Sequence, residues 1–328
     1  MQKAFHDFSQ IVKQARRFVL TTHVNPDPDA IGSELALARY LSSQGKIVAI
    51  LNHSTTPANC AFLDPENAIQ QFEPLPHANM VLNADVIIVL DANQPDRIQN
   101  LKPYVLQSRA TKICIDHHPD PLPFADLYIV DEAATATGEI LFNLLLYLDE
   151  ASITPEIATP LYTAIMTDTG SFRFPKTDPE LHRVVATLIE HGADPVQIYH
   201  DVYEQGTANR LLLLGNVLST LQMHHGGKVA SLIATQEMFN RTETTEEDTE
   251  NFVTYTLAVA GVQIGVMFTE LPEGIKISFR SRAAIAVNTL AQEFGGNGHV
   301  NAAGARMPQA ALADVFPRVI EQSKQYLV

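Results

Sequence analysis

The chain has few basic side chains for its length. Its 328 residues include 22 Lys and Arg against 37 Asp and Glu, which gives a formal net charge of -15. Proteins that track a long nucleic acid draw much of their affinity from basic side chains that displace counterions. The acidic balance therefore argues against such a partner. A small anionic substrate remains compatible with it, because metal ions or a few arginines reverse the field inside a single cleft.

Long apolar runs and paired cysteines are also missing. Near the N-terminus, Arg16 and Arg17 precede an apolar run of only residues 18–20, so the sequence indicates neither an exported protein nor a membrane protein. The two cysteines, Cys60 and Cys114, lie far apart and match no zinc-binding spacing. We interpret them as reduced thiols. These absences predict a cytoplasmic protein without a membrane partner.

The patterns that are present predict an α/β fold in two domains. With 46% hydrophobic residues the chain can bury a substantial core, and its length favours a division in two. A strand pattern at residues 17–23 precedes a helical pattern at 33–44, and the alternation continues along the first half. We expect a mostly parallel sheet flanked by helices over 1–190, a helical linker over 191–224, and a smaller α/β domain over 225–328.

Several predicted strands end in an acidic residue. Short, β-branched runs at residues 85–91, 112–116 and 127–131 are typical of buried parallel strands, and each closes on an aspartate. In open α/β sheets the ligand site forms outside the carboxyl ends of the strands. We therefore expect these acids to converge at one edge of the sheet.

The densest motif follows the first strand, where His23, Asp27 and Asp29 lie within seven residues. For either aspartate alone, capping of the following helix is an alternative role. The complete set of candidate metal ligands is His23, Asp27, Asp29, Asp91, His117 and Asp168. Six ligands of which one bridges suit two ions about 3.5–4 Å apart. Carboxylate and imidazole without thiolate favour Mn²⁺, with magnesium, iron, cobalt and zinc as alternatives.

These motifs resemble those of the DHH phosphoesterase superfamily. The matching motifs are His23-x3-Asp27-x-Asp29-Ala-x-Gly-Ser33, then Asp91, Asp116-His117-His118 and Asp168-Thr-Gly170, in that order. Near the C-terminus, residues 295–304 resemble the glycine-rich signature of the DHH-associated domain. Asn297 departs mildly from that signature, which usually has glycine there; asparagine tolerates left-handed backbone. The resemblance covers nearly the whole chain.

The resemblance implies a role for each ligand. One ion would be held by His23, Asp27 and Asp91, and the other by Asp29, Asp91, His117 and Asp168, so that Asp91 bridges. By the same pattern the catalytic residues are Asp91, Asp116 and His118. Asp116 would orient a histidine, for which a simple turn cap is the alternative. His118 would face the substrate, neutralising a phosphate oxygen or protonating the leaving group.

A substrate-binding region is predicted in the second domain. Apolar and polar residues alternate over 275–282, so a strand would present Arg280 and Arg282 on one polar face, which suits a phosphate. An ordinary solvated strand face is the alternative. Adding the glycine-rich turn and the resemblance, the predicted substrate-binding residues are Arg280, Ser281, Arg282, Asn288, Gly296, Gly298 and His299. The substrate would lie in a cleft between the two domains.

Among members of the superfamily, the chain most resembles the nanoRNases that also act as pAp phosphatases. That resemblance implies hydrolysis of RNAs of two to five nucleotides and removal of the 3′-phosphate from pAp, through a hydroxide that bridges two metal ions. A phosphodiesterase for cyclic di-AMP or pApA is the main alternative. Exonucleases for single-stranded DNA, inorganic pyrophosphatases and an inactive nucleotide sensor are weaker ones. The oligomeric state is left open, a homodimer included.

Overall fold

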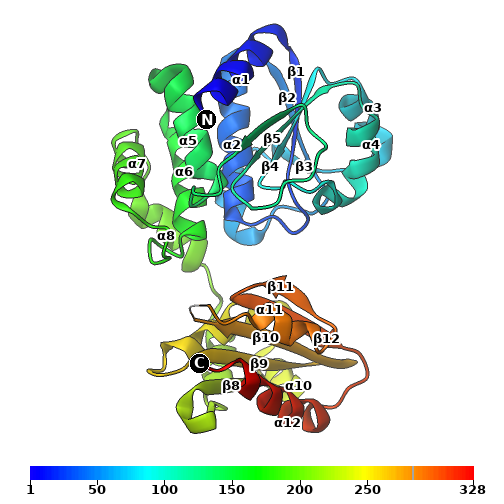
Figure 1. Cartoon of the computed structure of the whole chain (residues 1–328), viewed down its shortest axis with the longest axis vertical. Coiled ribbons are helices and arrows are strands. Elements are labelled where there is room, and N and C mark those ends of the chain that lie inside the picture. Colours follow the sequence, from blue (N-terminus) through cyan, green and yellow to red (C-terminus); the bar gives the residue numbers. More distant parts are fainter. Residues whose placement is uncertain (283) are drawn as a thin grey trace. The chain divides into compact units, whose positions relative to one another are not determined.

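The protein is described here by a computed structural model that covers residues 1–282 and 284–328. The chain forms two compact units, Met1–Gln205 (the N-terminal unit) and Gly206–Val328 (the C-terminal unit), and each is described by itself (Figure 1). The segment 191–224, predicted as a linker, is shared between them. Its helix α8 (Pro195–Tyr203) packs against α6 (Pro155–Asp168) of the N-terminal unit, whereas α9 (Ala208–Leu218) packs against the sheet of the C-terminal unit.

The N-terminal unit contains a six-stranded, fully parallel sheet. Its strands are β1 (Arg17–Thr21), β2 (Ile47–Asn52), β3 (Ile69–Gln71), β4 (Val86–Leu90), β5 (Thr111–Asp116) and β6 (Leu127–Val130), in the order β3-β2-β1-β4-β5-β6. The central strand β4 is buried along its whole length, which explains its continuous run of apolar, β-branched residues. This arrangement confirms the predicted α/β fold with a mostly parallel sheet.

Helices cover both faces of this sheet (Figure 1). One face packs against α1 (Gln2–Gln14), α2 (Pro28–Ser43) and α5 (Thr137–Asp149), and the other against α3 (Pro74–Leu82), α4 (Lys102–Gln107) and the 3-10 segment Pro95–Leu101. Helix α6 packs on α2 and α5, and α7 (Pro179–Glu190) packs on α5 and α6. Successive strand residues point to opposite faces. Phe18 and Leu20 of β1 accordingly join the first core, while Val19 joins the second.

The strand order reverses between β1 and β4, and this point locates the site. In doubly wound sheets the connections leave in opposite directions there and open a crevice at the carboxyl ends. Helix α2 follows β1 closely. It begins at Pro28, earlier than the predicted residue 33, because the Asp27 carboxylate accepts hydrogen bonds from the backbone N–H groups of Asp29 and Ala30 at 3.0 and 3.1 Å.

The C-terminal unit has a mixed six-stranded sheet of its own. In the order β11-β12-β10-β9-β8-β7, its strands are β11 (Asn297–His299), β12 (Ala302–Met307), β10 (Gly274–Ser281), β9 (Ile264–Leu271), β8 (Val229–Ala234) and β7 (Gln222–His224). Only the β8–β9 pair is parallel.

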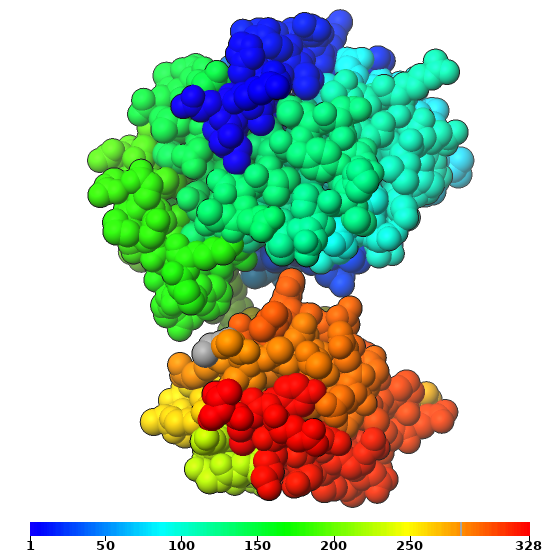
Figure 2. Space-filling view, viewed as in Figure 1, coloured from blue at the N-terminus to red at the C-terminus, as the bar shows by residue number. Residues whose placement is uncertain are grey.

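Helices α10 (Gln236–Thr242), α11 (Val287–Gln292) and α12 (Leu312–Ser323) complete the C-terminal unit. The space-filling view shows α12 and the residues after it packed over the surface of this unit (Figure 2). On β10, Ile275, Ile277 and Phe279 are buried in the core, as the alternating pattern predicts. Across both units, no described helix is both long and apolar enough to cross a membrane.

Candidate metal centre

The first group of ligands forms where the chain leaves β1 and β4. His23 follows β1 and Asp91 follows β4, and the Nε2 atom of His23 lies 3.2 Å from Oδ2 of Asp91. Each offers one candidate ligand atom within 4.8 Å of the other and of Asp27. The His23 ring is held through Nδ1, 2.9 Å from the backbone oxygen of Val24. Asp27 therefore both caps α2 and lies among the candidate ligands.

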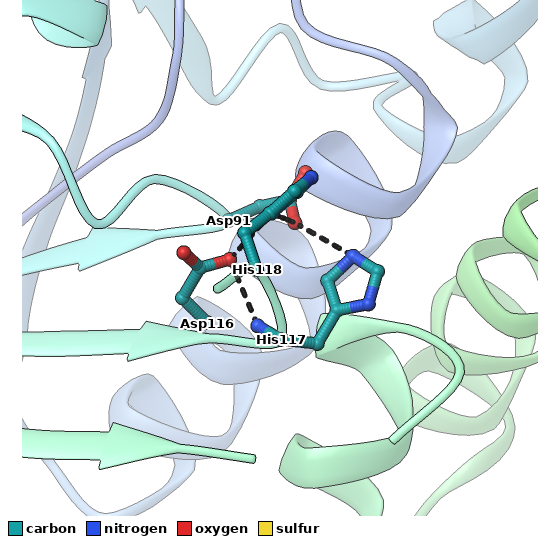
Figure 3. A group of neighbouring side chains, drawn as sticks. All are labelled: Asp91, Asp116, His117 and His118. Carbon is teal, nitrogen blue, oxygen red and sulfur yellow. Dashed lines mark hydrogen bonds and ion pairs between the residues drawn. The ribbon is translucent and has the colours of Figure 1, made fainter. Parts of the chain in front are cut away.

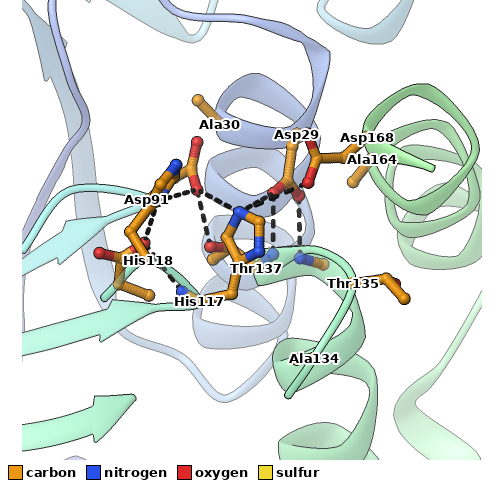
Figure 4. A network of polar contacts seen from close by, with 12 residues as sticks. Asp29, Ala30, Asp91, His117, His118, Ala134, Thr135, Thr137, Ala164 and Asp168 are labelled. Atoms are coloured by element: carbon orange, nitrogen blue, oxygen red, sulfur yellow. Dashed lines mark hydrogen bonds and ion pairs between the residues drawn. The ribbon is translucent and has the colours of Figure 1, made fainter. Parts of the chain in front are cut away.

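The second group comprises Asp29, His117 and Asp168, which come from α2, the end of β5 and the end of α6 (Figure 4). The Nε2 atom of His117 lies 3.4 Å from Asp168 Oδ2 and 3.9 Å from Asp29 Oδ2. The carboxylate of Asp29 accepts hydrogen bonds from the backbone N–H groups of Thr137 and Gly138 at 2.8 and 2.9 Å. These donors belong to the first turn of α5, whose exposed N–H groups favour a negative charge.

Asp91 lies between the two groups. While Oδ2 faces His23, Oδ1 lies 3.6 Å from Nε2 of His117 and accepts a hydrogen bond from the Thr137 hydroxyl at 2.9 Å. Its backbone is left-handed, with φ of 54°, and its N–H donates to Ile115 at 2.9 Å. Such a conformation costs a non-glycine residue on the order of 1–3 kcal/mol and is concentrated at functional sites. The arrangement aims one carboxylate at both groups.

The site concentrates negative charge that the surrounding side chains do not balance. Burial, reinforced by neighbouring carboxylates, raises the pKa values of Asp29 and Asp91 well above the ordinary value. Burial and the charge of Asp27 raise the pKa of Asp168 to about 6. Burial and the nearby His118 lower the pKa of His117 to about 4, so this imidazole is neutral near pH 7. Carboxylates with a neutral imidazole fit divalent cations, which would restore the carboxylates' normal ionisation.

Asp116 joins the two histidines that follow it (Figure 3). Its Oδ1 accepts a hydrogen bond from the backbone N–H of His117 and lies 2.8 Å from Nδ1 of His118. Within residues 1–282 and 284–328 its fully buried Oδ2 has no hydrogen-bond partner. Burial lowers the pKa of His118, but the bond to Asp116 and the charges of Asp91, Asp116 and Asp168 more than offset this and raise it above its usual value. Asp116 is thus placed to orient His118.

Two contributors to this site have no signal in the motif pattern. Thr137 holds both Asp29 and Asp91, and the Asn93 amide donates to the backbone oxygens of His118 and Pro119 at 2.8 and 3.0 Å. For Thr137 the sequence offers only a weak sign of its role, namely that small residues occupy the start of the helix. Asn93 resembles any loop asparagine.

In the C-terminal unit only some of the predicted substrate-binding residues lie on the same face of the sheet. Arg280 and His299 both pair with Ala302, on either side of β12, so these two residues share one face of the sheet. Burial lowers the pKa of Arg280, whose Nη1 donates to the backbone oxygen of Phe279 at 3.0 Å. Gly296 precedes β11 and Gly298 lies within it, and both approach β12 closely, because a Cβ on either would lie 2.2 or 2.5 Å from a β12 backbone oxygen.

The other predicted substrate residues differ in their surroundings. Ser281 points to the opposite face from Arg280 and is buried, donating to the backbone oxygen of Ile285 at 2.6 Å and accepting from the Asn301 amide at 2.8 Å. Arg282 follows the strand, is exposed, and donates to the backbone oxygen of Leu257. Asn288 lies on α11, where its side chain accepts from the N–H of Thr289. Asn301, in the glycine-rich signature, was not among the predicted residues.

The sheet and its cluster of carboxylates and imidazoles at the switch point form a framework suited to metal-assisted hydrolysis. Residues 17–165 match the DHH family, N-terminal domain, and residues 217–328 match the DHHA1 domain. The chain belongs to the DHH family of phosphoesterases, as its motifs predict.

Individual relatives share most of the chain. It is 33% identical over 309 residues to the bifunctional oligoribonuclease and PAP phosphatase NrnA of Thermus thermophilus, covering 94% of this chain and 89% of that protein. It is 22% identical to the cyclic-di-AMP phosphodiesterase PdeA of Listeria monocytogenes, covering 97% of this chain and 49% of that protein. The crystal structure of an exopolyphosphatase-related protein from Bacteroides fragilis superposes with a TM-score of 0.94 at 32% identity, covering 99% and 97% of the two chains.

Proposed function

We propose that this protein is a metal-dependent phosphoesterase that hydrolyses short oligoribonucleotides to mononucleotides and removes the 3′-phosphate from pAp. The observation that carries the proposal is the position of Asp91, which faces His23 through one carboxylate oxygen and His117 through the other. That position suits a ligand shared by two ions. The similarity to the Thermus NrnA supports the choice of substrates.

In the proposed centre His23, Asp27 and Asp91 would hold one ion, and Asp29, Asp91, His117 and Asp168 would hold the other. Two bound divalent ions, with Mn²⁺ favoured by the donor set, would lower the pKa of an attacking water and stabilise charge that develops on the phosphate. Asp91 would belong to both groups of ligands, because its two carboxylate oxygens face His23 and His117. Hydrogen bonds from the backbone N–H groups of Thr137 and Gly138 fix the orientation of the Asp29 carboxylate.

His118 is the proposed proton donor. Its pKa is raised, chiefly because the hydrogen bond to Asp116 and the nearby carboxylates outweigh the effect of burial. A raised pKa favours the protonated form of the imidazole, which can supply a proton to the leaving oxygen. Asp116 fixes the orientation of its ring at 2.8 Å. We propose that the C-terminal unit binds the phosphate end of the substrate with Arg280 and His299, which share a face of its sheet.

A second candidate is a phosphodiesterase for cyclic di-AMP or pApA, which the similarity to the Listeria PdeA favours. It would use the same metal centre and differ only in which nucleotide binds. An inactive sensor would also bind nucleotides, but the complete ligand set gives no reason to expect lost chemistry.

Turnover of matched substrates tests these functions. Purified protein with Mn²⁺ would receive pAp, pApA, a five-nucleotide RNA and cyclic di-AMP at equal concentrations, each with a chelated control. We expect chelator-sensitive release of mononucleotide from the RNA and of phosphate from pAp. Cleavage of cyclic di-AMP alone would favour the second candidate. Turnover of none of the four, with metal bound, would refute both.

A further inference from the structure

The loop after the metal-binding residue Asp168 carries an aromatic side chain that the proposed chemistry does not use. Phe174 is 54% exposed, and within residues 1–282 and 284–328 it is the one phenylalanine with more than half of its surface accessible. Phe172 in the same loop packs instead against Tyr162 and His182, with ring centres 6.0 and 5.7 Å apart. Packing of the core therefore explains Phe172 and leaves Phe174 without a role.

The loop holds the Phe174 ring in a defined place. The backbone N–H groups of Arg173 and Phe174 both donate to the backbone oxygen of Thr169, at 2.9 and 3.1 Å, and the N–H of Phe172 donates to the Thr169 hydroxyl at 3.0 Å. The ring lies against Gly170, where a Cβ would be 2.6 Å from two ring carbons. Gly170 also has a φ of 58°, which favours glycine. One edge of the ring is therefore fixed while much of its surface faces solvent.

The exposed ring lies against Gly170, in a loop that begins at the candidate ligand Asp168 and carries two cationic residues. Gly170 is two residues from Asp168, so their Cα atoms are at most about 7 Å apart. Arg173 donates to the backbone oxygen of Gly170 at 2.6 Å. Lys176 donates to the backbone oxygens of Glu132 and Ala134 at 2.7 and 3.1 Å, and its charge lowers the pKa values of His117 and Asp168.

We propose that Phe174 is a stacking surface for a nucleobase of the substrate. Proteins that bind single-stranded nucleic acid combine exposed aromatic side chains, on which bases stack, with basic side chains for the backbone. The loop presents this combination within reach of the candidate ligands. Stacking accepts every base, which suits a protein that degrades short RNA of mixed sequence. The inference rests on the proposed function and names the part of the substrate that the N-terminal unit recognises.

Base-free substrates separate stacking from chemistry. For Phe174→Ala we expect the KM for pApA to rise roughly 5- to 150-fold, the range that loss of one stacked base produces. The kcat should change by less than about two-fold, and the kinetics on an abasic analogue of pApA should stay unchanged, because that analogue has no base to stack. Phe174→Trp should retain the wild-type KM, whereas Phe174→Leu should behave like the alanine variant.

Tyr147→Ala provides a matched control. Tyr147 is 47% exposed in the same unit but lies ten residues beyond Thr137 on α5, about 15 Å along the helix. Its kinetics should match the wild type. Manganese bound per chain should be the same in all variants. Equal losses on pApA and its abasic analogue, reduced manganese content, or a normal KM for Phe174→Leu would each overturn the stacking assignment.

Binding measurements distinguish this inference from the proposed function. Calorimetry of binding to wild type and Phe174→Ala, with Mn²⁺ present and with pApA carrying a non-hydrolysable phosphonate linkage, reports stacking without turnover. A wild-type protein that binds pApA but never cleaves any substrate would refute the proposed function alone. Equal affinity of the two proteins for pApA would refute the stacking role alone.

Discussion

The candidate metal centre of the N-terminal unit and the polar face of β10 in the C-terminal unit differ in how far their charges are balanced by neighbouring side chains. At the metal centre Asp29, Asp91 and Asp168 lie close together, and burial raises the pKa of each. On β10, Lys276 is neutralised, because Glu246 contacts its amino group at 2.8 Å. The first arrangement leaves charge for a ligand to balance, whereas the second balances part of its charge within the chain.

The comparison also separates Lys276 from Arg280, although both lie on the same face of β10. Glu246 binds Lys276 and, through a second interaction, Arg306 of the neighbouring strand, so the end of the face near residue 276 has little net charge. Arg280 lies four residues further along and keeps its charge in a partly buried setting. Among the described residues Arg280 forms no ion pair like that of Lys276, although the charge of Glu250 acts on it, so the positive charge of this face is greatest at the Arg280 end.

The largest predicted effect is at the metal centre. Asp91→Ala should reduce kcat on the order of a thousand-fold or more, because both ligand groups lose their shared carboxylate. Bound manganese should fall, while the unfolding transition of the metal-free protein remains cooperative. Turnover, elemental analysis and circular dichroism check these outcomes.

Asp85→Ala is the control, since Asp85 lies at the opposite end of the same strand and pairs with Arg17 at 2.9 Å. It should leave kcat and metal content unaffected. If Asp91→Ala retained substantial activity, the shared-ligand role would be wrong.

The second prediction contrasts the two ends of the β10 face. Arg280→Ala should raise the KM for pAp roughly 10- to 100-fold with unchanged metal content, because a charge-assisted contact to phosphate is removed. Lys276→Ala should raise it far less, since Glu246 already occupies that amino group. Steady-state kinetics measure the KM of both variants. Equal increases in KM would contradict the proposal that the Arg280 end of the face, and not the Lys276 end, binds the phosphate.

The gathering of the candidate metal ligands was largely predictable from sequence for a topological reason. His23, Asp91 and Asp116 each lie at or just beyond the carboxyl end of a parallel strand, and the ends of neighbouring parallel strands meet at one edge. The order of the strands in the sheet brings these three side chains together, although they lie far apart in the sequence. The contribution of Thr137 could not be predicted in this way, since it depends on how α5 packs beside α2.

In the C-terminal unit the alternating pattern predicted the core but not the surroundings of the polar residues. A period of two places Ile275, Ile277 and Phe279 on one side without any knowledge of neighbours. Whether a cation on the other side is neutralised depends on a distant segment. Glu246 lies in the acidic stretch 243–250, a composition typical of a solvated surface, and only the folded chain brings it to Lys276.

A third prediction concerns a buried acid beside the metal centre. Glu34 of α2 is fully buried and accepts a hydrogen bond from Asn52 at 2.7 Å, and burial raises its pKa to about 8. Between its ordinary value of 4.5 and pH 8, the unfolded chain releases this proton and the folded chain retains it. The free energy of unfolding should therefore fall as pH rises through this window, by up to about 1.4 kcal/mol per pH unit.

Glu34→Gln removes this titration, so its stability relative to wild type should improve by a few kcal/mol between pH 5 and pH 8. Urea unfolding of the metal-free proteins at several pH values measures the difference. Glu180→Gln, an exposed substitution on α7, is the control: its free energy of unfolding should change with pH in the same way as that of the wild type. If the free energy of unfolding of Glu34→Gln instead followed that of the wild type between pH 5 and pH 8, Glu34 would have to be ionised in the folded protein over that whole range.

The smallest predicted effect tests whether Glu246 sets the charge of the β10 face. Glu246→Gln should destabilise the protein by less than about 1 kcal/mol, because Lys276 and Arg306 are partly exposed and such ion pairs contribute little. It should also lower the KM for pAp by roughly two- to three-fold at low ionic strength, an advantage that salt removes by screening. Glu243→Gln, an exposed change in the same acidic stretch, adds the same charge elsewhere and should leave KM unchanged. If both variants lowered KM equally, net charge alone would explain the effect, and the pairing of Glu246 with β10 would have no bearing on how substrate binds.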